Sequence, residues 1–177
     1  NRFGSLDHTG AHISREELHS YDVLFLAGGH VPTQNSFFHV IGLREKLKDF
    51  QGVIIGISAG SMNSADTVYI QPEEPGEAID NSFCRWGKGL GLTDIMLCPH
   101  YQMVKDKILD GKLLYNDITI PDMKGRELLL LNDGSYLHIT KSAADSIEED
   151  AVLYGEAYMI KNGSIIQLCD HEHSVCL

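Results

Sequence analysis

The segment Gly56-Ile57-Ser58-Ala59-Gly60 places a hydroxyl side chain between two glycines. It follows the apolar run Val53-Ile54-Ile55 and precedes small residues that are compatible with a helix. A strand, a sharp turn and a helix in this order present a serine hydroxyl at the strand end. Backbone amides at the start of the helix can then stabilise developing negative charge. The pattern predicts Ser58 as a nucleophile; a purely structural glycine turn is the alternative reading.

A serine nucleophile needs a base that takes its proton and an acid that orients the base. His100 comes directly after the apolar run that ends at Cys98 and Pro99, so it stands at a predicted strand end. Asp133 follows the next apolar run. Because such groups gather at the carboxyl ends of parallel strands, we predict His100 as the base. Asp133 fits the role of the acid and, equally well, that of a residue in an ordinary tight turn.

The order of these residues along the chain separates two classes of hydrolase. The usual α/β-hydrolase order is serine, acid, histidine, which here would need an acid such as Asp80 between Ser58 and His100. Asp80 falls within the irregular segment 71–92, which is rich in Pro, Gly and charged residues. The order Ser58, His100, Asp133 therefore fits the strand-end argument better, and an esterase that uses Asp80 is the alternative.

Gly28-Gly29 ends an earlier apolar run and is a second candidate contributor to the site. Such a loop can supply an amide to an oxyanion hole, although a tight connection from strand to helix explains the glycines equally well. His30 follows the glycines closely enough to line a pocket. We predict Gly28, His30 and Asn63 as substrate-binding residues.

The elements that must position these residues alternate between strand and helix. Apolar runs and helical spacing predict a short helix ending near His19, strands at 23–26, 53–57, 95–98, 127–131 and 136–140, helices at 34–49 and 103–114, and a hairpin of 158–161 with 164–168 around Asn162-Gly163. The alternation predicts an α/β fold with a largely parallel sheet flanked by helices and an antiparallel hairpin near the C-terminus. The whole of 1–177 is expected to be a single domain.

Composition narrows the class of protein. A hydrophobic content of 43% is ample for one core, and a formal net charge of −11 disfavours nucleic acid and anionic membranes as partners. Four cysteines without a CxxC pair indicate reduced thiols and a cytoplasmic protein. His171-Glu172-His173 with Cys176 superficially resembles a metal site, but its position at the end of the chain favours a tail, so no metal is expected. Assembly into a homo-oligomer stays open.

Four blocks in the same order resemble the dipeptidase E and cyanophycinase group of serine peptidases, peptidase family S51. They are Phe25-Leu26-Ala27-Gly28-Gly29, Gly56-Ile57-Ser58-Ala59-Gly60-Ser61, Cys98-Pro99-His100-Tyr101 and Leu131-Asn132-Asp133-Gly134-Ser135-Tyr136. The resemblance extends from about residue 21 to residue 168. It implies a fold like that of class I glutamine amidotransferases with serine in place of cysteine, a small peptide as substrate, and no cofactor.

Residue by residue, the resemblance implies Ser58 as nucleophile, His100 as base and Asp133 as acid, where the best-known relatives have glutamate. It also implies an oxyanion hole formed by the amides of Gly29 and Ala59. The chain has His30 where aspartyl dipeptidases have asparagine, and residues 62–75 do not reproduce the pattern associated with binding an N-terminal aspartate. Relatives begin with strands ahead of the position that matches residue 21, so we expect those strands to be lacking here. A catalytically silent, amidotransferase-like binding protein is the alternative from a different functional class.

Overall fold

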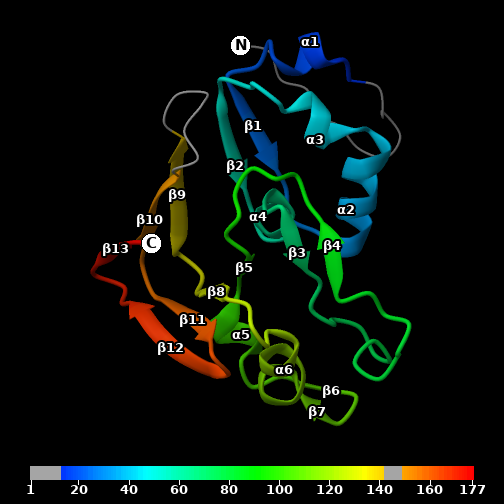
Figure 1. Ribbon diagram of the computed structural model, residues 1–177, viewed down its shortest axis with the longest axis vertical. Coiled ribbons are helices and arrows are strands. Elements are labelled where there is room, and N and C mark those ends of the chain that lie inside the picture. The colour runs from blue at the N-terminus through cyan, green and yellow to red at the C-terminus, as the bar shows by residue number, and fades with distance from the viewer. Residues whose placement is uncertain (1–12, 142–148) are drawn as a thin grey trace.

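The first part of the fold is a pair of parallel strands covered on one side by helices (Figure 1). The computed structural model describes residues 13–141 and 149–177. Strand β1 (Val23–Leu26) pairs with β2 (Val53–Gly56), as both apolar runs predict. The short helix α1 (Arg15–Leu18) is also confirmed, and the Ser14 hydroxyl accepts a hydrogen bond from the amide of Glu17 at 3.1 Å.

The two faces of the β1–β2 pair differ because successive side chains of a strand point to opposite sides. Leu24, Leu26 and Ile54 belong to a core cluster that the helices complete. The alternate apolar residues are exposed, and they are Val23, Phe25, Val53 and Ile55. The helical side of this pair therefore holds one core of the molecule, while the opposite face is open in the described residues.

The predicted helix over 34–49 is wrong in its bounds and its continuity. The structure has α2 (Val31–Val40) and α3 (Leu43–Lys46), separated at Ile41 and Gly42. Gly42 has a φ of 62°, a left-handed conformation that ends the first helix. The apolar spacing remains in phase across the break, since Phe38, Ile41, Leu43 and Leu47 are all buried in the same cluster.

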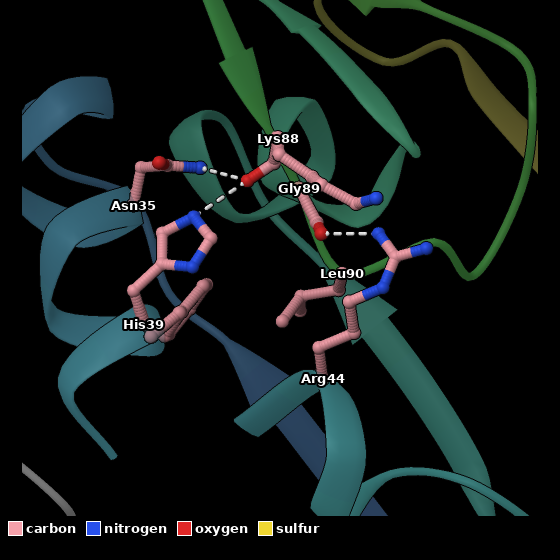
Figure 2. A pocket seen from close by; sticks show the side chains of 7 residues that line it. Asn35, His39, Arg44, Lys88, Gly89 and Leu90 are labelled. Atoms are coloured by element: carbon pink, nitrogen blue, oxygen red, sulfur yellow. Dashed lines mark hydrogen bonds between the residues drawn. The ribbon is translucent and has the colours of Figure 1, made fainter. Parts of the chain in front are cut away.

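Helices α2 and α3 are held against β4 (Trp86–Lys88), which pairs antiparallel with β3 (Thr67–Tyr69). Figure 2 shows Asn35 and His39 of α2 both reaching the carbonyl oxygen of Lys88, at 3.0 and 2.8 Å, and Arg44 of α3 donating to the carbonyl of Gly89 at 2.7 Å. The cavity among these residues is only about 10 Å³, scarcely the space of one water. This strand lies within the segment 71–92 that the sequence predicts as a loop.

A four-stranded sheet holds the larger core, in the order β12 (Ser164–Cys169), β11 (Ala157–Lys161), β8 (Leu128–Leu131) and β5 (Leu97–Cys98). Strand β8 is buried along its whole length, between β5, which runs parallel to it, and β11, which runs antiparallel. The predicted C-terminal hairpin is confirmed, with φ values of 52° at Asn162 and 78° at Gly163.

A three-stranded antiparallel sheet contains two strands that the sequence did not predict. Its order is β13 (Ser174–Cys176), β10 (Glu149–Tyr154) and β9 (Tyr136–Lys141). The segment interpreted as a solvated tail therefore ends in a strand, because the backbone of β13 pairs with β10. Within the described residues, no three His, Cys, Asp or Glu side chains are placed to hold a metal ion.

The predicted helix over 103–114 is also wrong. The structure has α5 (Tyr101–Val104), a small hairpin of β6 (Ile108–Leu109) and β7 (Lys112–Leu113), the π-helix η1 (Leu114–Thr119) and α6 (Ile120–Asp122). Asp110 and Gly111 have φ values of 53° and 79°, which make a hairpin turn and stop any helix.

The fold is mixed α/β, and the prediction of a largely parallel sheet is not met. The described strands form five small sheets, in which only the pairs β1–β2 and β5–β8 run parallel. The other described strand pairs are antiparallel, and two of them, β6–β7 and β11–β12, are hairpins joined by two-residue turns. No helix of the described residues has the length and apolarity needed to cross a membrane.

Candidate active site

Ser58 stands at the turn between β2 and α4 (Ala59–Ser64) in a strained backbone conformation. Its φ and ψ are 52° and −117°, which few non-glycine residues adopt. The turn is tight because helix and strands touch: a side-chain carbon added to Gly60 would lie 2.0 Å from the carbonyl oxygen of Leu26 in β1. A glycine is required at this position, because only a residue without a side chain lets the first turn of α4 pack against β1.

The Ser58 hydroxyl, the His100 imidazole and the Asp133 carboxylate lie in one line of hydrogen bonds. His100 Nε2 is 3.0 Å from Ser58 Oγ, and His100 Nδ1 is 2.5 Å from Asp133 Oδ1. A neutral imidazole that donates from Nδ1 to the carboxylate has its Nε2 lone pair free to accept the serine proton. The structure thus brings together the three residues predicted as nucleophile, base and acid.

His100 owes its position to the end of β5. It follows Cys98 and Pro99 and has a φ of 61° and a ψ of 25°, so the chain turns sharply before α5 begins at Tyr101. Asp133 lies in the turn between β8 and β9, where Ser135 N–H donates to the Asn132 carbonyl at 3.0 Å. Because β5 and β8 are parallel neighbours, their carboxyl ends place the two residues at the same edge of the sheet.

The glycine loop after β1 passes directly beside the serine. A side-chain carbon added to Gly28 would lie 3.3 Å from Ser58 Cβ and 3.8 Å from its Oγ. Gly29 has a φ of 151°, which side chains disfavour, and the space around its missing Cβ is open. Ala59 is the first residue of α4, so its amide belongs to the first turn, which has no acceptor within the helix. Of the two residues whose amides are predicted for an oxyanion hole, Ala59 directly follows Ser58, and Gly29 directly follows Gly28, which lies beside Ser58.

The structure places two of the predicted substrate-binding residues at accessible positions and buries the third. Gly28 is beside Ser58, and His30 is exposed, with its Nδ1 2.8 Å from the hydroxyl of Thr33. Asn63 is completely buried, and its amide side chain bonds the carbonyl of Val31 and the side chains of Gln34 and Asn35. Asn63 therefore ties α4 to α2, and the expectation that it meets a substrate is corrected by its burial.

Asp80 is not brought to the histidine. Its carboxylate accepts hydrogen bonds from the hydroxyl and the amide of Ser82, which lower its pKa, and Asp133 occupies the Nδ1 side of His100. The geometry places Asp80 in a local turn of an exposed loop.

The thiol of Cys98, close to the base, is buried. Burial raises its pKa to about 12, so the group stays a neutral thiol near pH 7. The Tyr115 hydroxyl lies 3.8 Å from its sulfur, and burial raises the pKa of that hydroxyl too. Neither group is ionised near pH 7, so neither competes with Ser58 as a nucleophile.

Glu73 carries a perturbed carboxyl group in the loop that follows β3. Desolvation raises its pKa, and the charges of His30 and Lys107 act in the opposite direction.

The larger described cavity lies away from Ser58, His100 and Asp133, with a volume of about 400 Å³. Its lining contains none of the predicted site residues and consists of Asp94, Ile95, Met96, Glu127, Leu129, Ala151, Met159 and Leu177.

Two contacts around the site were not predicted. Gln34 Nε2 donates to the carbonyl of Ala27 at 2.6 Å and so supports the glycine loop. Gln102 Oε1 accepts from the amide of Asp133 at 3.0 Å. Neither glutamine belongs to a motif, and the only sequence signal was proximity to Gly28-Gly29 and to His100.

Comparison with known proteins identifies a family. The model of peptidase family S51 matches residues 6–147. A crystal structure of a peptidase from an acI-B1 Actinobacterium superposes with a TM-score of 0.61 at 18% sequence identity, over 92% of this chain and 63% of that chain. The chain thus spans less than two thirds of that structure's length, and the likeness concerns the fold. The curated proteins contain no match. Because the family model covers most of the sequence, including the strand ends that carry Ser58, His100 and Asp133, the chain belongs to peptidase family S51.

Proposed function

We propose that this chain hydrolyses small peptides by serine-type catalysis, with Ser58 as nucleophile, His100 as general base and Asp133 as the acid that orients it. The observation that carries the proposal is the continuous line from Ser58 Oγ to His100 Nε2 and from His100 Nδ1 to Asp133 Oδ1. Membership of a peptidase family supports the choice of a peptide as substrate.

Acylation begins when Ser58 Oγ attacks the carbonyl carbon of the peptide bond and His100 Nε2 takes the hydroxyl proton. The carboxylate of Asp133 holds the Nδ1–H and stabilises the imidazolium that forms. His100 then gives the proton to the leaving amine, and the acyl group stays on Ser58. In the second half a water attacks the ester carbonyl while His100 Nε2 takes one of its protons. The bond from the acyl carbon to Ser58 Oγ then breaks, His100 returns the proton to Oγ, and the carboxylic acid product leaves.

The negative charge on the carbonyl oxygen needs donors that are in place before the reaction. The amides of Gly29 and Ala59 are the proposed donors, because one follows the residue packed on Ser58 and the other begins α4. Removing one such donor costs about 10²- to 10³-fold in kcat in well-studied hydrolases. The reaction uses no metal or organic cofactor in this scheme.

The finer parts of the proposal concern fold type and substrate. We propose that the arrangement corresponds to the class I glutamine amidotransferase-like fold, with Ser58 at the position of the cysteine. The sharp turn at Ser58 between β2 and α4 and the parallel pair β5–β8 support this proposal. Small peptides, rather than proteins, follow from the resemblance to dipeptidase E.

Hydrolysis of a dipeptide panel by wild type and by Ser58→Ala tests the proposal. We expect turnover of at least one dipeptide by the wild type and a loss of about 10³-fold or more in kcat for the variant. Equal activity in both proteins would reject Ser58 as the nucleophile. Tight peptide binding without turnover in either protein would favour the silent binding protein instead.

A further inference from the structure

The acid and base of the site are unusually open to solvent. The side chains of His100 and Asp133 are 43% and 49% exposed. Within the described residues the Asp133 carboxylate has a single protein partner, His100 Nδ1. Water competes for an exposed carboxylate, so burial alone does not hold this pair in one geometry.

The position of the Asp133 carboxylate therefore depends on how firmly the backbone of Asp133 is held. On either side of it, Asn132 N–H donates to the Glu156 carbonyl at 3.1 Å and Ser135 N–H donates to the Asn132 carbonyl at 3.0 Å. The amide of Asp133 itself is bound by Gln102 Oε1 at 3.0 Å. Gln102 is half-buried and lies in α5, two residues after His100. The short helix that follows the base therefore also supplies the side chain that binds the backbone of the acid.

We propose that Gln102 is a positioning residue that holds Asp133 within reach of His100, a role that rests on the proposed function of these two residues. Aspartate has a short side chain, so a shift of its backbone moves the carboxylate by nearly the same amount. A misplacement of about 1 Å in a catalytic arrangement can cost as much as 10²-fold in rate. The bond from Gln102 removes this freedom on the side of the turn that faces α5.

The contact is a simple one, which allows a matched pair of substitutions. The only hydrogen bond of the Gln102 side chain within the described residues uses its oxygen as an acceptor. Gln102→Met keeps the length and removes the acceptor. Gln102→Glu keeps an acceptor oxygen in the same place. Gln167→Met is the control, because Gln167 is an exposed glutamine on β12, away from the site.

Steady-state kinetics with the best dipeptide measure the effect. We expect Gln102→Met to lower kcat by about tenfold with KM within about twofold of wild type, since the ground-state binding of the peptide does not involve this residue. Gln102→Glu should restore kcat to within about threefold, and the Gln167 control should change neither constant. An unchanged kcat in Gln102→Met, or a change confined to KM, would overturn the proposal.

A double-mutant cycle separates positioning from general damage to the fold. If Gln102 acts through the acid, Gln102→Met has no further effect on kcat in an Asp133→Asn background. A merely structural role would lower kcat by the same factor in both backgrounds, and that result would overturn the proposal.

A readout that needs no turnover keeps the inference distinct from the proposed function. The proton between His100 Nδ1 and Asp133 should give a low-field imidazole N–H resonance in the wild type and in Gln102→Glu, absent in Asp133→Asn. Gln102→Met should broaden it by faster exchange with water. If Ser58→Ala retains full activity, the proposed function fails, and the positioning role of Gln102 is then tested by this resonance alone. An identical resonance in wild type and Gln102→Met would refute that role.

Discussion

At the scale of single residues, backbone strain coincides with the proposed chemistry. Ser58 and His100 have φ values of 52° and 61°, and neither is a glycine. Such conformations cost of order 1–3 kcal/mol each and persist where surrounding contacts fix them. Here the strain turns the serine hydroxyl and the imidazole toward each other from two separate strand ends.

The identity of the acid can be tested by comparing two asparagine substitutions. We expect Asp133→Asn to lower kcat/KM for a dipeptide by about 10²- to 10⁴-fold, because the imidazole loses its orienting charge and its tautomer. Asp80→Asn should leave kcat/KM within about twofold, since Asp80 binds only Ser82. A large loss in Asp80→Asn with an unaffected Asp133→Asn would restore the esterase reading.

At the scale of elements, the site depends on how closely α4 approaches β1 and β2. Gly60 is the contact point, as its Cα faces the backbone of Leu26. The side chain of Asn63 adds hydrogen bonds from α4 to α2. The turn at Ser58 is therefore fixed by the packing of Gly60 on β1 and by the hydrogen bonds of the buried Asn63 amide.

Gly60→Ala should disturb this contact. Its new methyl group would overlap the Leu26 carbonyl, and overpacking of this kind costs about 1–3 kcal/mol in the free energy of unfolding. Urea denaturation measures the loss. Gly87→Ala is the matched control, because its nearest neighbour would be the flexible tip of Ile70 at 3.3 Å. Equal stability of Gly60→Ala and wild type would show that α4 does not need the close approach.

An ion pair between elements predicts a dependence of stability on pH. Arg44 of α3 binds Asp66, between α4 and β3, at 2.5 Å, and this hydrogen bond lowers the pKa of Asp66. A carboxylate with a lowered folded-state pKa stabilises the fold above its unfolded pKa of about 4, and the contribution is lost as the pH falls through the folded value.

We therefore expect the unfolding free energy of Asp66→Asn to fall less than that of wild type between about pH 6 and pH 3. Urea denaturation across this range checks the difference. The control is Asp22→Asn, whose carboxylate forms no ion pair within the described residues and which should follow the wild-type curve. Parallel curves for Asp66→Asn and wild type would contradict the role of the pair.

The sequence predicted which of Ser58, His100 and Asp133 would lie together better than it predicted the elements between them. The strand ends at Leu26, Cys98 and Leu131 were clear because each apolar run stops near glycine, proline or a turn residue, whereas the strand predicted over 53–57 ends one residue earlier, at Gly56. The helix over 103–114 failed because Asp110-Gly111 makes a left-handed turn that helical spacing does not reveal. Strands β10 and β13 were missed because their pairing is between distant segments, which no local pattern encodes. Gln102 was missed for the same reason.

At the scale of the whole molecule, two separate clusters of buried side chains divide the support of the site. One lies between β1 and helices α1 to α3, and the other surrounds β8 and β11. Ser58 follows a strand of the first region, whereas His100 and Asp133 follow strands of the second. The geometry of the three residues therefore reports how the two regions pack on each other, and α4 contributes Ala59 and Met62 to the second cluster.

The second cluster should dominate global stability. Leu130 of β8 is completely buried, and Leu130→Ala should lower the free energy of unfolding by about 2–5 kcal/mol through lost contacts and a cavity. Ile166→Ala on β12, where the side chain is 45% exposed, should change it by no more than about 1 kcal/mol. Thermal or urea denaturation compares the two, and similar losses would contradict the assignment of the core.

The central claim is that Ser58 is a nucleophile activated by His100. Incubation with a fluorophosphonate probe, followed by mass spectrometry of the digested protein, tests it directly. We predict a single phosphonylated residue, Ser58, with labelling slowed by orders of magnitude in His100→Asn and abolished in Ser58→Ala. Absence of labelling in the folded wild type, or labelling of Ser58 at the same rate without His100, would contradict the account.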